Sequence, residues 1–166
     1  NPHRFFLQAE VKCLHLPGTE VCKPFLSYKV YGDNLFEQVD KAVGFVVDII
    51  KQAVIQQKHT PQFRRPFEIP ISAIQEATVN AVAHRNYNVT SGVQVMVFAD
   101  RIEVWNSGSL PPELSVEDLR KPHTSYPANP LLANALYLGS YIQRTGSGTV
   151  EMIKQCHDQG VPEPEF

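Results

Sequence analysis

Three polar side chains, Glu76, Asn80 and His84, recur at four-residue spacing in an otherwise apolar stretch. On a helix this spacing places them on one face, one above the other. Glu76 carries the only formal charge between Ile71 and Ala83, so this helix has no solvated face and must be largely buried. A buried carboxylate is costly unless it is paired or serves a site. The residues alone therefore leave two interpretations open: a hydrogen-bonded network within the core, or a functional site.

A second candidate for chemistry is the turn Gly146-Ser147-Gly148-Thr149, which directly precedes a predicted helix. Glycine lets the backbone approach a ligand closely. The free N–H groups at the start of a helix, together with the helix dipole, suit a phosphate. The turn therefore indicates either a phosphate cradle or a simple tight turn.

A third candidate is the pair Asn106 and Gly108, which follows a predicted strand. A side-chain amide at this place can contact the edge of a base, and glycine leaves room for the ring. The alternative is an Asx-type turn, in which the amide bonds to its own backbone.

The elements that must position these residues begin with a hairpin. Period-2 patterning on both sides of a Pro-Gly turn predicts two paired strands within residues 4–32. Asn34, followed three residues later by Glu37, has the form of a capping box. Apolar residues then recur at helical spacing, which predicts a long amphipathic helix over residues 35–57.

The middle of the chain carries the polar stripe and a second hairpin. A short strand is predicted at residues 67–69, followed by a helix that Ser72 and Gln75 open as a capping box and that runs to about Asn86. Residues 93–104 alternate across a two-residue turn, which predicts a tight antiparallel hairpin.

The last third of the chain begins with a loop. Residues 110–129 are rich in proline and polar residues, with a short helix predicted at 115–119, and long loops of this kind are usually functional or mobile. A helix is predicted over 130–138, and another runs from the glycine turn to about Gln159. The complete pattern predicts an α+β fold.

Composition narrows the function further. The 166 residues suffice for one domain with a single core. The chain has 15 Lys+Arg and 17 Asp+Glu, so it lacks the excess of basic residues that binding to a nucleic-acid phosphate backbone usually needs. The longest apolar stretch is far too short to span a bilayer. Cys13, Cys22 and Cys156 show no metal-binding spacing and are expected to be reduced thiols of a cytoplasmic protein.

A modest basic cluster lies between the two predicted helices. It consists of Lys58, His59, Arg64 and Arg65. The cluster has no periodic pattern, so it is either a solvated loop or a direct contact to nucleic acid.

The order of these features resembles that of the GHKL ATPases, the family of gyrase, MutL and histidine kinases. The resemblance covers residues 35–166. It implies a two-layer α/β sandwich of the Bergerat type, with a mixed sheet covered by helices on one face. Residues 1–34 would form an N-terminal β-hairpin packed on this domain, and the domain would be truncated at its C-terminal strand near Phe166.

Several segments carry a closer resemblance. The stretches are 76–87 (EATVNAVAHRNY), 106–111 (NSGSLP), 129–133 (NPLLA) and 144–148 (RTGSG). They are similar to the C-terminal region of bacterial proteins labelled RecG-related helicases or transcriptional regulators, which join an Alba-like DNA-binding domain to a GHKL-like one. No glycine here is followed by lysine, so the segment lacks the phosphate-binding loop that a helicase motor needs.

The resemblance implies ATP and Mg²⁺ as ligands. At the matching positions, Asn80 would hold Mg²⁺ and Glu76 would be the general base that activates the attacking water. The strand-end motif would contact adenine, the glycine turn would take the phosphates, and the loop 110–129 would be the lid. The nucleotide-binding residues predicted in this way are Asn80, His84, Asn106, Gly108, Gly146, Ser147, Gly148 and Thr149.

Two departures from the family pattern shape the predicted activity. Asn106 stands where GHKL enzymes usually have Asp, and the glycine turn has two glycines where many relatives have a third. We therefore expect nucleotide binding with at most a weak Mg²⁺-dependent ATPase activity.

The predicted function is an ATP-binding regulatory domain of a DNA-binding transcriptional regulator or RecG-related protein, which is not itself a helicase motor. DNA would be contacted through domains outside this segment, no membrane partner is expected, and the sequence leaves a homodimer open. The alternative is a non-catalytic protein-interaction module that has lost nucleotide binding.

Overall fold

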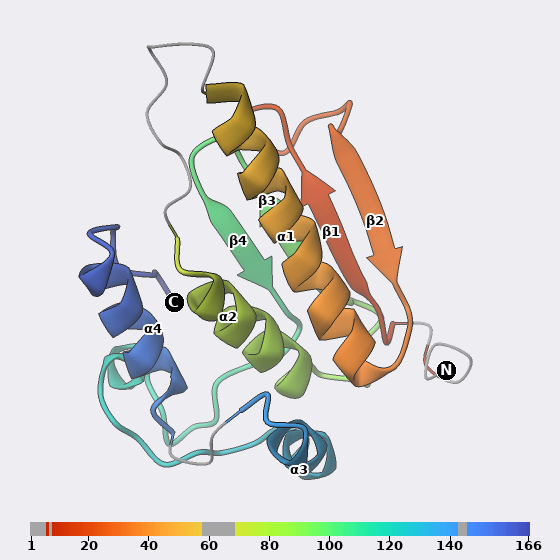
Figure 1. The fold of residues 1–166 in the computed structure, drawn as a ribbon. Helices are drawn as coiled ribbons and strands as arrows, with labels where there is room; N and C mark the ends of the chain where they lie inside the picture. The colour runs from red at the N-terminus through yellow and green to blue at the C-terminus, as the bar shows by residue number, and fades with distance from the viewer. Residues whose placement is uncertain (1–5, 7, 58–68, 143–145) are drawn as a thin grey trace.

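Two antiparallel hairpins lie side by side and are joined into one mixed sheet by a parallel pair of strands (Figure 1). The computed structural model describes residues 6, 8–57, 69–142 and 146–166. β1 (Val11–His15) pairs antiparallel with β2 (Ser27–Tyr31) and parallel with β3 (Val93–Val97). β3 in turn pairs antiparallel with β4 (Ile102–Trp105). The sheet order is therefore β2-β1-β3-β4, and both predicted hairpins are confirmed.

The helices cover one face of this sheet. α1 (Leu35–Gln57) and α2 (Ile71–Ala83) lie next to each other across the strands, and α4 (Gly148–Asp158) packs on the side of α2 that faces away from α1 (Figure 1). α3 (Pro130–Leu138) lies at one end of this layer (Figure 1). The predicted α+β sandwich, with a mixed sheet, an N-terminal hairpin and helices on one face, is confirmed.

Alternation along the strands explains why the two faces differ. Val11 pairs in register with Val93, and Cys13 pairs with Val95, so that these side chains share the face beneath α1 and α2. All four are fully buried. A separate buried cluster belongs to the opposite face and consists of Leu14, Leu16, Met96 and Phe98.

The ends of α1 and α3 agree with the predicted boundaries. The Glu37 N–H donates to Asn34 Oδ1 (3.1 Å), and Asn34 Nδ2 donates to Glu37 Oε1 (2.7 Å), which ties down the first turn of α1. Pro130 is the first residue of α3, where its missing N–H costs nothing. The local sequence patterns therefore predicted the first residues of both helices correctly.

The predicted boundaries of α2 were wrong at both ends. The residue before the helix is Pro70, not Ser72, and no side chain caps it. Ser72 lies inside the helix and its Oγ donates to Gln155 Oε1 of α4 (2.6 Å), a long-range partner that local spacing does not reveal. The helix ends at Ala83 rather than Asn86.

A connection that we call the long loop, residues 106–129, links β4 to α3. It contains a short 3-10 helix, η2 (Glu117–Arg120), where a helix was predicted slightly earlier at 115–119. Ser115 precedes η2, and both its N–H and its Oγ donate to the Asp118 carboxylate. Ser115 and Val116 therefore precede the helix instead of forming its first turn.

Two predictions concern the connection between α1 and α2. The predicted strand at 67–69 and the basic cluster of Lys58, His59, Arg64 and Arg65 lie outside the described residues, apart from Ile69.

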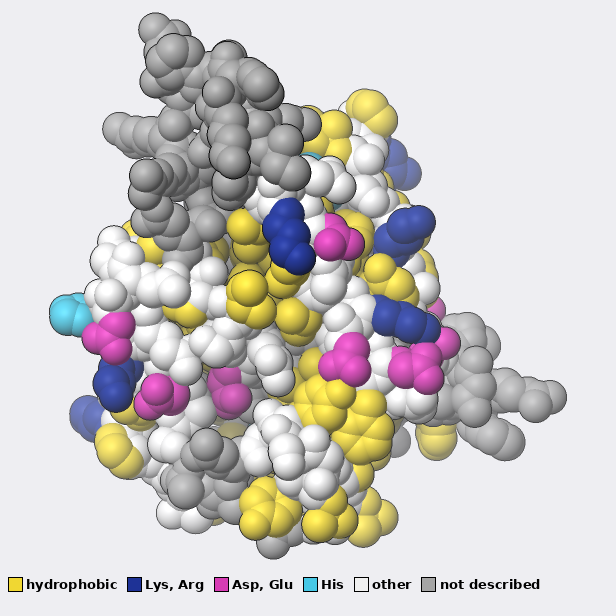
Figure 2. All heavy atoms as spheres, viewed as in Figure 1, with side chains coloured by type: hydrophobic (Ala, Val, Ile, Leu, Met, Phe, Trp, Pro, Cys, Tyr) yellow, Lys and Arg dark blue, Asp and Glu magenta, His cyan; other side chains and the backbone are white. Residues whose placement is uncertain are grey.

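Among the helices that the structure describes, none is long and apolar enough to cross a membrane. α3 exposes Leu131 (85%) and Leu138 (73%), and apolar side chains gather at that end of the molecule in Figure 2.

Candidate functional site

The polar stripe of α2 is present and is held together by hydrogen bonds. Asn80 Nδ2 donates to Glu76 Oε1 at 2.9 Å, and both side chains are half-buried. His84 is the residue that caps the helix, and its backbone N–H donates to Asn80 O at 2.9 Å. Burial of the neighbouring apolar side chains, such as Val79 and Val82, leaves this stripe as the polar part of a buried helix.

The bond between Asn80 and Glu76 uses only one half of the Asn80 amide. The nitrogen donates to the carboxylate, while within the part of the chain that the structure describes the oxygen Oδ1 accepts no hydrogen bond. Amide oxygens are among the hard ligands that Mg²⁺ takes in proteins. Asn80 is therefore oriented so that its oxygen can serve a cation.

Burial changes the acid–base properties of Glu76. Removal of the carboxyl group from water raises its pKa above the ordinary value, and the hydrogen bond from Asn80 opposes part of this rise. A carboxylate whose pKa moves towards neutrality is a stronger base at physiological pH than an exposed one. The position thus suits proton transfer, although it also costs stability.

The glycine turn meets Glu76 directly. A Cβ atom at position 148 would overlap Oε1 and Cδ of Glu76, so a larger residue there would displace the Glu76 carboxyl group. Gly148 is also the first residue of α4, and the N-terminal end of a helix favours a neighbouring negative charge. Two motifs that are far apart in the sequence therefore come together at one point.

The other glycine of the turn faces the long loop. Gly146 has a positive φ of 62°, and a Cβ atom there would overlap the carbonyl oxygen of His123. Thr149 Oγ1 and His123 Nδ1 are both buried and have no hydrogen-bond partner among the described residues. Because buried polar atoms are usually bonded, these two are groups that a ligand or water would satisfy. Ser147, which precedes α4, makes no side-chain cap of that helix.

The strand-end motif forms an Asx turn. Gly108 N–H donates to Asn106 Oδ1 at 2.5 Å, which occupies the oxygen of that amide. A Cβ atom at Gly108 would overlap the carbonyl oxygen of His84, so this motif packs against the C-terminal end of α2. Asn106 itself is exposed. The motif is therefore brought to the end of the polar stripe, with one hydrogen bond already made to the Asn106 oxygen.

A hollow of about 470 Å³ lies at the His84 end of the stripe. Both ends of the long loop line it, together with the first residue of α3. Its lining residues are His84, Ser109, Leu110, Pro111, Pro112, Ser125, Tyr126, Pro127, Ala128 and Pro130. Burial lowers the pKa of His84 below its ordinary value, so this side chain is neutral at physiological pH.

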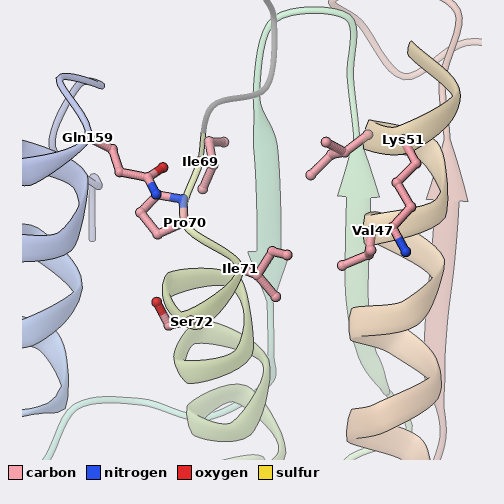
Figure 3. Close-up of a pocket in the computed structure, with 8 residues that line it drawn as sticks. Val47, Lys51, Ile69, Pro70, Ile71, Ser72 and Gln159 are labelled. Atoms are coloured by element: carbon pink, nitrogen blue, oxygen red, sulfur yellow. The ribbon is translucent and has the colours of Figure 1, made fainter. Parts of the chain in front are cut away.

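A larger hollow of about 610 Å³ lies near the opposite end of α2 and contains none of the predicted site residues. Figure 3 shows Val47 and Lys51 of α1 on one side of this hollow and Gln159, just after α4, on the other side. Ile71 of α2 lies between these two sides. Among the described residues that line it, most are apolar and Lys51 is the one that carries a charge. The acid, amide and glycine groups meet elsewhere, so we place the candidate site along the stripe.

Sequence reasoning missed two residues that hold the site in place. Asn129 Nδ2 donates to Ala83 O and to Arg85 O, both at 2.8 Å, across the C-terminal end of α2. Arg85 is 1% exposed, and its Nη1 donates to the carbonyl oxygens of Gln8 (3.1 Å) and Glu10 (2.8 Å). Asn129 precedes Pro130 and so suggests a helix cap, but nothing local indicates these distant partners.

The fold is similar to that of a known protein. The DIP2311 protein from Corynebacterium diphtheriae superposes with a TM-score of 0.74 at 19% sequence identity. The match covers 96% of this chain and 31% of that one, so the chain spans about a third of the length of the solved protein. Among curated proteins, none matches the sequence.

A family model matches the C-terminal part of the chain, from Thr90 to Phe166. The matched part includes the strand-end motif, the long loop and the glycine turn, whereas Glu76, Asn80 and His84 precede it. The site is thus built half from the matched segment and half from α2. Residues 90–166 are similar to the family described as "Putative ATP-dependent DNA helicase recG C-terminal".

Proposed function

We propose that this chain is a nucleotide-binding domain that takes ATP with Mg²⁺ along the polar stripe of α2. The observation that carries the proposal is the meeting of Glu76, Asn80 and Gly148 at the start of α4. A cation ligand, a carboxyl group and a helix N-terminus are the parts that a phosphate chain with Mg²⁺ needs. The match of residues 90–166 to an ATP-dependent family supports the same ligand.

The residues present fit such a ligand. Within the described residues no side chain caps the first turn of α4, and the N–H groups of a first helical turn suit phosphate oxygens. Thr149 Oγ1 is a buried hydroxyl that lacks a partner among the described residues. At Gly146 and Gly148 the space of a side chain is taken by His123 and Glu76, which brings the Glu76 carboxyl group directly beside the start of α4.

A cation fits at Asn80 through its free amide oxygen. The described residues contain no group of three or more His, Cys, Asp or Glu side chains that could hold a metal ion alone. Mg²⁺ commonly keeps several waters and takes its other ligands from one or two side chains and from the phosphates. When bound, it would neutralise charge on the phosphates beside Glu76.

Hydrolysis would depend on Glu76. A carboxyl group with a raised pKa that lies beside the start of α4 is placed to accept a proton from an attacking water. The bond from Gly108 N–H already uses one lone pair of the Asn106 oxygen, and this amide lacks the charge of an aspartate, so its contact with a base would be weaker. We therefore propose that binding, rather than rapid turnover, is the main activity.

The bound state would regulate neighbouring parts of the protein. The long loop contacts the glycine turn at His123 and the segment after α4 through an ion pair of Arg120 with Glu163 (2.7 Å). A ligand at the turn would thus act on the loop and on the residues beyond α4. We propose that this coupling serves a DNA-binding regulator or RecG-related protein whose other domains contact DNA.

The test is a titration of a non-hydrolysable ATP analogue, with and without Mg²⁺, against the wild type and Asn80→Ala. We expect Asn80→Ala to weaken Mg²⁺-dependent binding about tenfold, equal to roughly 1.4 kcal/mol. Gln75→Ala removes an amide from the same helix outside the stripe and should bind as the wild type does. Absence of binding to the wild type at millimolar nucleotide would refute the proposal.

That negative result would favour a non-catalytic interaction module. In such a module Asn80 and Glu76 would act only as mutual hydrogen-bond partners within the fold. Asn80→Ala would then lower the free energy of unfolding without changing any nucleotide response. Stability and binding measured on the same variants therefore separate the two functions.

A further inference from the structure

The last residue of the long loop, Asn129, is bound to the C-terminal end of α2. Its Nδ2 donates one hydrogen to Ala83 O and the other to Arg85 O, at 2.8 Å each. Both acceptors belong to the segment in which α2 ends and turns away. One side chain therefore bridges two carbonyl groups that the helix itself leaves unbonded.

The first residues of the long loop reach the same place. Ser107 Oγ donates to Asn86 O at 3.2 Å. Gly108 lies so close to His84 O that a Cβ atom would overlap it. The four consecutive carbonyl groups of residues 83–86 are thus contacted by the two ends of one loop.

Asn129 is also the residue before α3, where Asn normally caps the helix with its side chain. Here the side chain makes no such cap, because its amide is turned to Ala83 and Arg85. The sequence position suggests one role and the hydrogen bonds show another. This difference gives a way to test which role matters.

We propose that Asn129 is a positioning residue that holds the last part of the long loop on the end of α2, beside the contacts of Ser107 and Gly108, and so shapes the hollow beside His84. The hollow is lined by residues just inside each end of the loop, Ser109 to Pro112 and Ser125 to Ala128. The distance between those two walls depends on the carbonyl groups to which they are fixed. Its meaning for ligand binding rests on the proposed function, since the hollow continues the polar stripe.

The clamp also depends on how firmly residues 83–86 are held. Arg85 is buried, its guanidinium lies 4.2 Å over the Tyr87 ring, and it donates to backbone carbonyls of the segment before β1. The anchor of the loop is therefore itself fixed to the sheet.

The experiment is amide hydrogen exchange in the nucleotide-free protein, for the wild type, Asn129→Asp and Asn129→Ser. Gly108 and Leu114 are useful reporters, because their N–H groups are bonded within the loop. Asp and Ser are good helix caps but replace the amide donor, and Asp places a carboxylate against two carbonyl oxygens. Asn88→Asp makes the same charge change at an exposed position and is the matched control.

We expect Asn129→Asp to speed exchange at both reporters on the order of tenfold, with β3 and the Asn88→Asp control unchanged. Asn129→Ser, which keeps one hydroxyl donor, should lie between. Reporter exchange equal to that of the wild type in Asn129→Asp would overturn the clamp and assign the side chain to capping α3. Equal acceleration of β3 and the reporters in both variants would overturn it too, because that pattern is general unfolding.

The same samples test the function separately. If the wild type binds the Mg²⁺ complex of the ATP analogue, Asn129→Asp should release it faster. If no variant binds nucleotide but the reporters respond as expected, the clamp stands and the proposed function fails.

Discussion

Gly148 lies against the carboxyl group of Glu76, and a side chain at this position would require the Glu76 carboxyl group to move, because Oε1 fills that space. The contact joins the middle of α2 to the first residue of α4. It also explains why the start of α4 is glycine, a residue that otherwise weakens a helix. The contact makes the two positions interdependent, which mutations can measure.

Gly148→Ala should lower the free energy of unfolding by about 1–3 kcal/mol, because the new methyl group overlaps Glu76. In a Glu76→Ala background the overlapping atoms are gone, and the same change should cost little or should stabilise the protein. Chemical denaturation of the two single variants and the double variant gives the coupling energy. Gly44→Ala, in an open position of α1, is the control and should stabilise by roughly 0.5–1 kcal/mol.

Glu76→Gln should stabilise the protein at neutral pH by roughly 0.5–2 kcal/mol while it removes any hydrolysis. The folded state raises the pKa of Glu76, so the folded protein binds this proton more tightly and the wild type loses stability as pH rises above about 4.5. The advantage of Gln should therefore vanish in acid. Denaturation at several pH values checks this, and a gain that persists below pH 4.5 would contradict it. Glu113→Gln, at an exposed carboxylate, should show no gain.

His84 predicts a second pH dependence, of opposite direction. Burial lowers its pKa, so the unfolded chain binds this proton more readily and stability is lost as pH falls below the ordinary value of 6.5. His84→Gln should flatten the pH dependence of the midpoint of denaturation between pH 7 and 5. His15, whose pKa burial also lowers, keeps its own contribution in both proteins. An unchanged slope in the variant would mean that His84 does not titrate differently in the two states.

The three thiols should differ strongly in reactivity. Cys22 is exposed, whereas Cys13 and Cys156 are buried. Burial raises the pKa of Cys13 to about 12 and also raises that of Cys156, so neither forms the reactive thiolate readily. A thiol reagent should label one equivalent quickly in the native protein and the others only on unfolding, and Cys22→Ser should abolish the fast phase. Fast labelling that survives in Cys22→Ser would show that a buried thiol becomes accessible.

Local patterns predicted those elements whose limits are set within a few residues. Asn34 and Glu37 bond to each other across the first turn of α1, and a proline begins α3. The start of α2 escaped prediction because Ser72 bonds to a residue of α4 instead of capping its own helix. A capping pattern cannot show that its side chain has a better partner elsewhere.

The candidate site likewise combines a local contact that the sequence predicts with long-range contacts that it does not predict. Spacing alone placed Glu76 and Asn80 on one face of a helix, and the hydrogen bond between them agrees with that spacing. The approach of Gly148 to Glu76 and of Asn129 to Ala83 joins segments that are remote in sequence. Such contacts arise from the packing of whole elements, so no short motif records them. The roles assigned to the site residues stay predictions until nucleotide binding is measured.

The parallel pairing of β1 with β3 has a consequence for how the chain folds. The chain between Val11 and Val93 includes α1, α2 and the connection between them. The two strands of each hairpin, by contrast, are close together in the sequence. Closing so long a loop is entropically costly and slow compared with forming a hairpin or a helix. We therefore expect the two hairpins and α1 to form early, and the joining of β1 to β3 to limit the folding rate. Valine-to-alanine changes at this seam would then slow folding more than they speed unfolding.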